Sequence, residues 1–366
     1  MFKNYYQGKK VFITGHTGFK GGWLSFWLKQ LGAEVKGYAL APCTEPNFFN
    51  ALGLEKEIQS EIGNIRDEAK LKKSIEDFKP EIIFHLAAQP LVRRSYLEPK
   101  LTFETNIMGT INLFEAVRQV KSVKTVINIT SDKCYENKEW VYGYRENDPM
   151  GGYDPYSSSK GCAELVTASY RNSFFHPDDY GKKHTVALAS VRAGNVIGGG
   201  DWSEDRLIPD CIKAFIKNET VIIRSPNATR PWELVLEPLS GYLWLGALLN
   251  EDPKKYSGGW NFGPADKDIW TVERVVSNIC KIWKTGKYEI VLNTDLHEAK
   301  LLKLDVSKAH FYLKWHPVYH AEKAIEETVK WYQNYYEAPS NIKKYTLEQL
   351  KNYSLQAKSL NLIWTE

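Results

Sequence analysis

The stretch Lys10-Val11-Phe12-Ile13-Thr14-Gly15-His16-Thr17-Gly18-Phe19-Lys20-Gly21 decides the fold of this chain. Its first five residues include the β-branched and aromatic side chains that predict a strand. An apolar-periodic segment from Trp23 to Leu31 comes after the glycines and predicts a helix. The chain therefore begins with a strand, a tight glycine turn and a helix in direct succession.

The same alternation of strand and helix continues along the chain. Further strands are expected at residues 34–40, 81–86, 125–130 and 185–191, and further helices at residues 71–78, 105–120 and 156–170. Near-continuous apolar strands that alternate with helices predict an α/β fold, with a Rossmann-like, doubly wound parallel sheet covered by helices on both faces.

The alternation of strands and helices becomes less regular after Arg192, where glycines and prolines are frequent. This change predicts a smaller C-terminal substrate-binding lobe. Residues 235–250 still resemble a strand and helix, and residues 260–262 a short strand. We therefore expect a dinucleotide-binding, Rossmann-like lobe over residues 1–191 that also takes in residues 233–263. The substrate-binding lobe would consist of residues 192–232 and 264–366.

Composition excludes several classes of function. The 48 basic and 44 acidic residues nearly balance at a formal charge of +4, unlike the basic face of a nucleic-acid-binding protein. Five cysteines without a C-x-x-C pair predict neither a disulfide framework nor a metal site, and they favour the cytosol. The first ten residues lack the apolar core of a signal peptide. The apolar segment 239–249 is about half the ~20 residues that span a membrane, so we expect a buried helix.

The glycine turn predicts a dinucleotide site. Gly15, Gly18 and Gly21 are spaced three apart at the start of a helix, where backbone N–H groups can bind a pyrophosphate. The alternative is a turn that serves only close packing of helix on strand.

The second strand ends in Gly37-Tyr38-Ala39-Leu40-Ala41, without the acid that usually binds the adenosine ribose and without an arginine for a 2′-phosphate. The residues themselves thus leave NAD and NADP open.

Two further segments are expected at the same edge of the sheet. Leu86-Ala87-Ala88-Gln89 closes a strand with small residues that leave room for a cofactor, although helix packing explains them equally well. Thr130-Ser131-Asp132-Lys133 ends the next strand.

Tyr156 and Lys160 stand at i and i+4 on a predicted helix, so both side chains lie on one face. A nearby cation lowers the pKa of a phenol from about 10 toward working pH, as a general base for an alcohol requires. Such a pair also arises by chance, but Ser131 at the adjacent strand end can hold a substrate hydroxyl beside Tyr156.

Asp132 and Lys133 then suit elimination of water, in which one group protonates a leaving hydroxyl and another takes a carbon-bound proton. Without Tyr156 and Lys160, this pair would be a solvated strand end.

The G-x-x-G-x-x-G turn together with Ser131, Tyr156 and Lys160 resembles the extended short-chain dehydrogenase/reductases. The segments 130–137, 143–146 and 151–156 closely resemble the CDP-glucose branch of the hexose-nucleotide 4,6-dehydratases, in which Asp-Lys stands where related dehydratases carry Asp-Glu. The resemblance extends from residue 8 to about residue 320, and it implies NAD as the cofactor.

The resemblance also implies which residues bind each ligand. For the cofactor they are Gly15, Thr17, Gly18, Phe19, Gly21, Asn64, Ile65, Leu86, Ala87, Ala88, Asn106, Tyr156, Lys160 and Ala193. For the nucleotide sugar they are Gln89, Ser131, Asn195, Arg206, Arg224 and Arg230. Arginine forks fit a diphosphate, but each of these arginines is as readily explained by a surface ion pair.

The implied reaction converts CDP-glucose to CDP-4-dehydro-6-deoxyglucose, in deoxysugar and O-antigen-type polysaccharide biosynthesis. Tyr156 would deprotonate O4 while C4 is oxidised, Asp132 would protonate the departing O6, and Lys133 would act at C5. A sugar-nucleotide epimerase or reductase, and a non-catalytic nucleotide-sugar binding protein, are the alternatives. We expect a cytoplasmic homodimer or homotetramer with no nucleic-acid or membrane partner.

Overall fold

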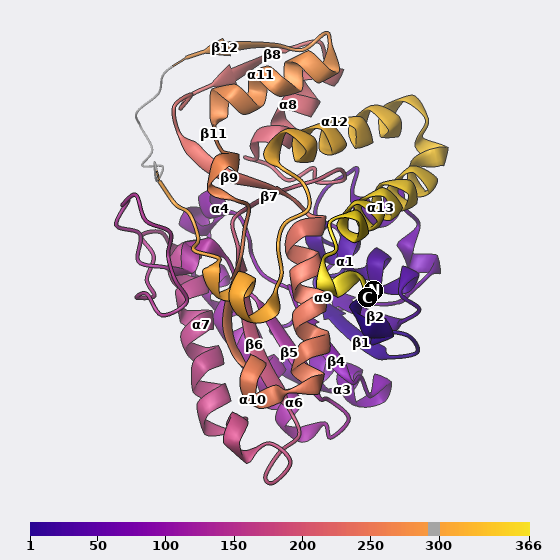
Figure 1. Cartoon of the computed structure of the whole chain (residues 1–366), viewed down its shortest axis with the longest axis vertical. Coiled ribbons are helices and arrows are strands. Elements are labelled where there is room, and N and C mark those ends of the chain that lie inside the picture. Colours follow the sequence, from indigo (N-terminus) through magenta and orange to yellow (C-terminus); the bar gives the residue numbers. More distant parts are fainter. Residues whose placement is uncertain (292–300) are drawn as a thin grey trace.

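The computed structural model describes residues 1–291 and 301–366. A seven-stranded sheet forms its centre, in the order β10-β6-β5-β4-β1-β2-β3, and neighbouring strands pair in parallel (Figure 1). The strands are β1 (Lys10–Thr14), β2 (Glu34–Ala39), β3 (Gln59–Ile62), β4 (Ile82–His85), β5 (Thr125–Ile129), β6 (Ala187–Ala193) and β10 (Gly258–Phe262). The expected α/β fold with a parallel sheet is confirmed.

Strands β3 and β10 differ in how well the sequence predicted them. β3 was not expected, because its residues Gln59 to Ile62 are mostly polar and exposed, as an edge strand allows. β10 pairs with β6, so the strand expected at residues 260–262 returns to the main sheet from late in the chain.

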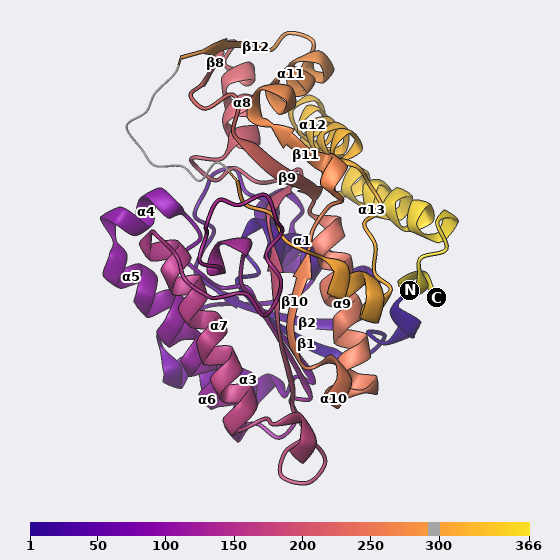
Figure 2. The same cartoon turned by 60° about the vertical axis from the view of Figure 1, so that its left-hand side comes forward.

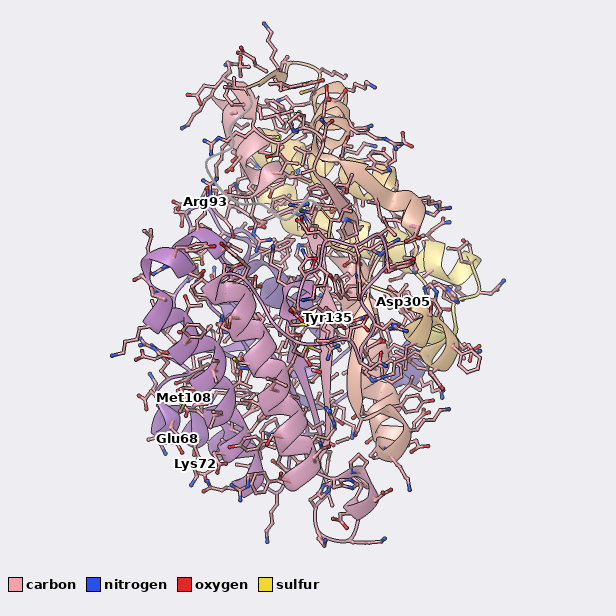
Figure 3. The ribbon with its side chains drawn as sticks, turned by 90° about the vertical axis from the view of Figure 1, so that its left-hand side faces the viewer. Glu68, Lys72, Arg93, Met108, Tyr135 and Asp305 are labelled. Carbon is pink, nitrogen blue, oxygen red and sulfur yellow. The ribbon has the colours of Figure 1, made fainter. Side chains whose placement is uncertain are left out.

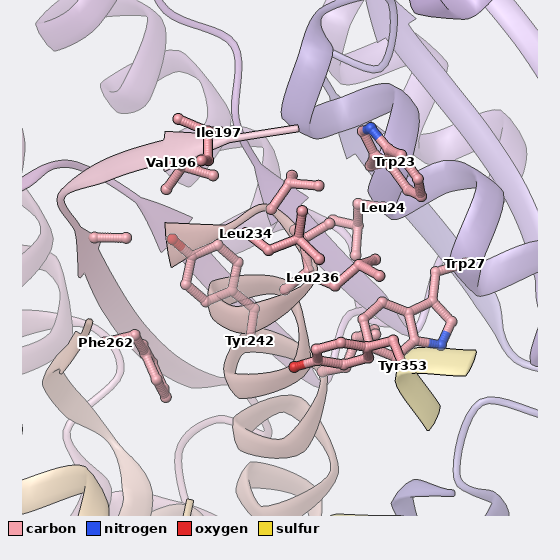
Figure 4. Close-up of a cluster of buried hydrophobic side chains, with 14 of the residues drawn as sticks. Trp23, Leu24, Trp27, Val196, Ile197, Leu234, Leu236, Tyr242, Phe262 and Tyr353 are labelled. Atoms are coloured by element: carbon pink, nitrogen blue, oxygen red, sulfur yellow. The ribbon is translucent and has the colours of Figure 1, made fainter. Parts of the chain in front are cut away.

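Helices cover both faces of the sheet. They include α1 (Phe19–Gln30), α3 (Glu68–Phe78), α6 (Gly109–Gln119), α7 (Pro155–Ser173) and α9 (Leu236–Glu251). The side chains of β1 alternate between two cores: Val11 and Ile13 pack with residues of α1 and α9, whereas Phe12 packs with residues of α3 and α6. The core shared by α1 and α9 is shown in Figure 4, where Trp23, Trp27 and Tyr242 are labelled.

Helix α9 is buried on all sides from Leu236 to Leu249, which confirms the buried helix expected at residues 239–249. It lies between the sheet and the C-terminal helices. No helix in the described ranges is long and apolar enough to cross a membrane.

Above the main sheet lies a second group of elements (Figures 1 and 2). It contains a three-stranded sheet of β7 (Asn195–Ile197), β9 (Thr229–Leu234) and β11 (Ile269–Thr271), and a pair of strands, β8 (Thr220–Ile223) and β12 (Lys287–Ile290). Its helices are α8 (Leu207–Ile216), α11 (Val272–Trp283) and α12 (Ala321–Glu337). The remaining short helices are α2 (Phe48–Ala51), α4 (Val92–Leu97), α5 (Pro99–Phe103) and α10 (Pro253–Tyr256).

The end of the chain closes the core beside its beginning. Helix α13 (Ile342–Ser359) places Tyr353 against Trp27, with ring centroids 5.9 Å apart. Trp364 stacks on Phe2 at 5.3 Å, and the backbone N–H of Lys3 donates to the carbonyl oxygen of Glu366 at 3.0 Å. The two termini therefore lie side by side, as both views show.

Candidate active site

The site lies at the carboxyl edge of the main sheet. Because β1, β4, β5 and β6 are parallel, the residues that follow them meet at one edge. Gly15, Leu86, Ser131 and Gly194 stand at or just beyond these strand ends. A Cβ atom on Gly194 would come 3.4 Å from Asp132 Oδ2, so the end of β6 adjoins the residues after β5.

The glycine turn is built for close backbone approach. Gly15 has a left-handed φ of +79°, and a Cβ there would lie 2.8 Å from the backbone nitrogen of Ala87. A Cβ on Gly21 would lie 2.1 Å from the Gly15 carbonyl oxygen, so this position also requires glycine. Gly18 is exposed and caps α1 without a side-chain hydrogen bond, and the first turn of α1 has no acidic residue. The helix N-terminus therefore offers accessible N–H donors and a partial positive charge to an anion.

The residues around this turn hold it in place rather than face outward. Thr17 Oγ1 donates to the Leu40 carbonyl oxygen at 2.9 Å, which joins the turn to the end of β2. His16 is buried against Ser60, with Nε2 2.7 Å from Oγ, and burial lowers the pKa of His16 to about 4. Its imidazole is neutral at physiological pH, and a Cβ on Gly37 would collide with the ring.

Sequence reasoning did not find the buried hydrogen-bond chain beneath the small residues after β4. Thr14 Oγ1 accepts from the backbone N–H groups of Leu86 at 3.1 Å and Ala87 at 3.2 Å. Thr14 is also 2.7 Å from His85 Nδ1, and burial lowers the pKa of His85 to about 3. This chain fixes the loop through Leu86, Ala87 and Ala88 against the glycine turn. The sequence signal for this chain of hydrogen bonds was a threonine and a histidine, Thr14 and His85, at the ends of two strands.

Asn106 joins this loop to helix α7. It lies in a π-helical turn, Glu104–Met108, of the kind frequent at functional sites. Its side chain accepts from Gln89 N at 2.8 Å and donates to Ser159 Oγ on α7 at 2.8 Å. The side-chain amide of Gln89 is itself engaged with Leu91 and Thr102, so the structure gives Gln89 a role in holding the loop.

The residues after β5 form a short 3-10 turn, Asp132–Cys134, capped by Ser131. Ser131 Oγ donates to Asp132 Oδ1 at 2.8 Å and accepts from Lys133 N at 3.2 Å. Asp132 is buried, whereas Lys133 is half-buried. The two residues predicted for elimination therefore differ in environment, and the carboxylate is the one held by Ser131.

Helix α7 presents Tyr156 and Lys160 to the same edge. The helix is capped by Asp154, which accepts from Ser157 N at 2.9 Å, and Pro155 occupies its first position. Burial raises the pKa of Tyr156 to about 12, opposed by a hydrogen bond with Ser131 and by the positive charge of Arg206. Burial also lowers the pKa of Lys160 to about 8, and Lys20 adds to this shift.

The cation with the largest effect on Tyr156 is therefore Arg206, where sequence reasoning had assigned that role to Lys160. Arg206 is half-buried, and its Nε lies 3.7 Å from Asp201 Oδ2. Lys160 instead points back along the strand, with Nζ 3.4 Å from the Ile129 carbonyl oxygen. The i, i+4 spacing places both residues on one helix face but does not fix where a long side chain ends.

Behind the site, a buried ion pair joins α7 to the sheet. Glu164 on α7 accepts from Arg192 Nε at 2.9 Å and from Arg192 Nη2 at 2.7 Å, and both side chains are only 4% exposed. Glu164 also accepts from Thr130, which precedes Ser131, and from Ser190 at 2.7 Å. These bonds fix the helix that carries Tyr156 relative to the strand that carries Ser131.

The network continues toward the second lobe. Arg192 donates to Tyr135, whose hydroxyl group donates to Asn261 Oδ1 at 2.8 Å. Asn261 in turn donates to the carbonyl oxygen of Asp305 at 3.1 Å. Figure 3 shows Tyr135 near the middle of the molecule, between α7 and the segment that contains Asp305. Four segments distant in sequence therefore meet behind the site.

The remaining predicted residues lie around this centre. Asn64 is half-buried, with its side-chain oxygen bonded to Arg66 N, and Ile65 is buried. Ala193 is buried at the end of β6, and Asn195 opens β7. The three arginines differ, since the charge of Arg206 lowers the pKa of Tyr156, Arg230 is half-buried on β9, and Arg224 is exposed just after β8.

Comparison with known proteins agrees with this geometry. The profile of the GDP-mannose 4,6 dehydratase family matches residues 12–245. The CDP-glucose 4,6-dehydratase of Salmonella typhimurium is 56% identical over 332 residues, which cover 90% of this chain and 92% of that protein.

Among solved structures, the epimerase Mth375 from Methanothermobacter thermautotrophicus has a TM-score of 0.78 at 21% identity, covering 93% of this chain and 96% of that one. MoeE5 in complex with UDP-glucose and NAD has a TM-score of 0.73 at 20% identity, covering 89% and 99%.

The sheet order, the glycine turn after β1 and the Ser131, Tyr156 and Lys160 set define an extended short-chain dehydrogenase/reductase. Within this class of enzymes, the chain belongs to the GDP-mannose 4,6 dehydratase family. The resemblance to sugar-nucleotide dehydratases expected from the sequence is confirmed.

Proposed function

We propose that this enzyme dehydrates CDP-D-glucose to CDP-4-dehydro-6-deoxy-D-glucose with NAD as its cofactor, as a step in deoxysugar biosynthesis. The observation that carries the proposal is the 56% identity, across nearly the whole of both chains, to a CDP-glucose 4,6-dehydratase. The buried Asp132, hydrogen-bonded to Ser131 beside Tyr156, supports a dehydratase over an epimerase, since an epimerase needs no acid for a leaving hydroxyl.

The residues at the carboxyl edge fit NAD. The uncapped, exposed start of α1 suits the pyrophosphate, and the close approach of Gly15 and Gly21 leaves the surface of the turn to backbone groups. Gly15, Thr17, Gly18, Phe19 and Gly21 would hold the pyrophosphate end, and Asn64 and Ile65 the adenine end. When bound, NAD would supply a reversible hydride store for C4 and C6 of the sugar.

Tyr156 and Ser131 prepare the sugar for oxidation at C4. Tyr156 takes the proton from O4 while Ser131 holds the same oxygen by a hydrogen bond. The pKa of Tyr156, raised to about 12 by burial, favours a phenol that is protonated at rest. Substrate and cofactor charges, together with Arg206, would then have to assist ionisation of the phenol during turnover.

Ser131 connects the base to the acid. Its hydroxyl group bonds both Tyr156 and Asp132, so the proton taken from O4 has a hydrogen-bonded path to the carboxylate. Asp132 donates a proton to O6 as the C6–O6 bond breaks, and Lys133 takes the C5 proton, which the C4 ketone has acidified. O6 leaves as water. C5 then regains a proton as C6 is reduced, so protons taken and given balance over the cycle.

We also propose how the molecule is divided and where it works. Residues 1–191 and 233–263 would hold the dinucleotide and the remainder the nucleotide sugar, since α9 and β10 pack on the main sheet. A homodimer or homotetramer is supported by exposed apolar side chains on adjoining elements: Leu97 on α4, Met108 in the π-helical turn Glu104–Met108, and Leu165 on α7. Five free cysteines support the cytosol.

The decisive experiment incubates the enzyme and NAD separately with CDP-, dTDP-, GDP- and UDP-glucose. We expect the alkali-induced absorbance of a 4-keto-6-deoxy sugar with CDP-glucose in large excess over the others. Deuterium placed at C4 should appear at C6 of the product, because the cofactor returns it. Label lost to solvent, or a C4-epimerised sugar as the product, would contradict the proposal.

A further inference from the structure

A small buried cluster, separate from the two main cores, adjoins the turn that carries Asp132. Its members come from the end of this turn, from the loop that precedes α7 and from a segment late in the chain: Cys134, Tyr135, Tyr144, Leu302 and Leu304. The loop and the late segment also pair through their backbones. Tyr144 N–H donates to the Lys303 carbonyl oxygen at 2.9 Å, and Asp305 N–H donates to the Tyr144 carbonyl oxygen at 2.9 Å. The late segment is therefore attached to the surroundings of the turn.

Tyr135 fixes the end of the turn Asp132–Cys134, whereas Ser131 fixes its start. The backbone N–H of Tyr135 donates to the Asp132 carbonyl oxygen at 3.4 Å. The hydroxyl group of Tyr135 accepts from Arg192 and donates to Asn261 Oδ1 at 2.8 Å. The Tyr135 ring stacks on Tyr144, with the ring centroids 5.3 Å apart. Backbone, ring and hydroxyl group are thus all held, and the end of the turn has one defined position.

Asn261 on β10 joins this tyrosine to the loop and to the late segment. The side-chain nitrogen of Asn261 donates to the carbonyl oxygens of Tyr144 at 2.8 Å and Asp305 at 3.1 Å. Its backbone N–H donates to Glu146 Oε1 at 2.9 Å. Because its side-chain oxygen accepts from Tyr135, the whole amide is used in joining four segments. Asn261 and Tyr135 are both buried.

Arg192 separates this network from the bonds that hold α7. Its Nε and Nη2 atoms donate to Glu164 on α7, at 2.9 Å and 2.7 Å, whereas Nη1 donates to Tyr135. Asn261 is the register partner of Arg192 on the neighbouring strand. Loss of the Tyr135 hydroxyl group would therefore remove a bond at the turn Asp132–Cys134 and leave both bonds to the helix that carries Tyr156.

The two stages of the proposed reaction depend on different parts of this structure. Oxidation at C4 needs Tyr156 on α7, whereas loss of water needs Asp132 within hydrogen-bond reach of O6. The same bound sugar passes through both stages. A displacement of the turn by about 1 Å can cost about 10²-fold in the step that depends on it. Such a displacement would slow elimination and spare oxidation.

We propose that Tyr135 and Asn261 are positioning residues of the elimination step, which hold the turn Asp132–Cys134 where Asp132 reaches the leaving O6. This inference rests on the proposed function. Both residues act through Asp132 and form or break no covalent bond in the reaction. The proposal is carried by an unbroken series of hydrogen bonds that runs from Asp132 through Tyr135 and Asn261 to Asp305. Figure 3 labels Tyr135 and Asp305, near the two ends of this series.

The test follows product formation and the absorbance of bound, reduced nicotinamide after the enzyme is mixed with CDP-glucose. Tyr135→Phe keeps the stacked ring and removes the hydroxyl group. We expect kcat for the 4-keto-6-deoxy product to fall about tenfold or more, with KM changed less than about threefold. Reduced cofactor should accumulate above the wild-type level, because oxidation continues while elimination is slowed. Asn261→Asp keeps the acceptor for Tyr135 but loses the amide donors to Tyr144 and Asp305, and it should behave in the same way.

Tyr353→Phe is the matched control. Tyr353 is also a buried tyrosine, and its hydroxyl group donates to Glu237 Oε2 at 2.8 Å, between α13 and α9. Its loss removes a buried hydrogen bond in a different part of the molecule. We expect a lower melting temperature, as for Tyr135→Phe, with wild-type kcat and no added reduced cofactor.

A wild-type level of reduced cofactor in Tyr135→Phe, or the same accumulation in Tyr353→Phe, overturns the proposal. Asn261→Asp decides if Tyr135→Phe does not fold. If neither variant folds, the network is a requirement of folding and the proposal is likewise overturned. A wild-type enzyme that converts none of the nucleotide glucoses overturns the proposed function, and with it this inference. An active wild type with unchanged variants overturns the role of Tyr135 and Asn261 alone.

Discussion

At the scale of the residue, the site depends on the hydroxyl group of Ser131. It caps the turn Asp132–Cys134 and bonds both Tyr156 and Asp132, so one side chain orients the proposed base and the proposed acid together. Lys133 bonds this hydroxyl group through its backbone N–H, which donates to Ser131 Oγ, and the residue is half-buried. The structure thus gives the proposed acid, Asp132, a defined position and leaves the side chain of Lys133, which we propose acts at C5, more freedom.

Tyr156→Phe should lower kcat by about 10²–10⁴-fold, because it removes the proton acceptor for O4. The affinity for NAD and CDP-glucose, measured by calorimetry, should change little, since the ring and its packing remain. Ser157→Ala, on the same helix but bonded to Asp154, serves as the control and should retain most activity. A rate near wild type for Tyr156→Phe would rule out the assigned base.

Asp132→Asn and Lys133→Met should both stop the reaction between oxidation and elimination. The amide cannot protonate O6, and the thioether cannot take the C5 proton. We expect each variant to lose at least about 10²-fold in formation of the 4-keto-6-deoxy product. Lys133→Met should also exchange C5–H with deuterated solvent more slowly than wild type, as followed by mass spectrometry. Wild-type rates in both variants would make the pair an ordinary strand end.

At the scale of the element, the position of helix α7 relative to the sheet is fixed by bonds in the middle of the helix rather than at its N-terminal end, where Tyr156 lies. Asp154 and Pro155 begin the helix, but Glu164, two turns beyond Tyr156, carries the bonds to Arg192, Thr130 and Ser190. Because these partners lie on or next to β5 and β6, the distance between Tyr156 and Ser131 is set by a buried network that lies behind the candidate site.

Glu164→Gln should destabilise the enzyme by about 3 kcal/mol, because it leaves the buried Arg192 charge without its partner. Urea unfolding measures this change in the free energy of unfolding, and kcat should fall because Tyr156 is less firmly placed. Glu98→Gln removes an exposed partner of Arg94 and should cost less than about 1 kcal/mol. Equal effects of the two substitutions would contradict the structural role of the buried pair.

At the scale of the whole molecule, segments from both ends of the chain complete one core. β10 returns to the main sheet, and α13 and Trp364 pack on the N-terminal residues. Between the lobes, Arg93 on α4 forms an ion pair with Asp205 at 2.7 Å, where the upper elements meet the lower ones (Figure 3). The outer surface near Met108 and Leu165 carries exposed apolar side chains.

If this outer surface is the oligomer contact, Leu165→Glu should lower the molecular mass in solution toward that of one chain of 42.0 kDa. A charge placed in an apolar contact must lose its hydration when the subunits meet. Light scattering after size exclusion measures the mass. Leu355→Glu, an equally exposed leucine on α13, should leave it unchanged. A monomeric wild type would contradict the expectation.

The sequence by itself determined the parallel sheet, the glycine turn and the candidate catalytic set, because these depend on local patterns: near-continuous apolar strands between helices, glycines three apart, and side chains at i and i+4. The sequence also predicted Asp132 as a candidate acid and the resemblance to the family. Only the tertiary structure decided the partners of long or buried side chains. Among the cations, Arg206 rather than Lys160 acts most strongly on Tyr156, and Glu164 forms an ion pair with Arg192. Such encounters join residues from distant strands and helices, and their charge states follow from burial, which sequence spacing does not encode.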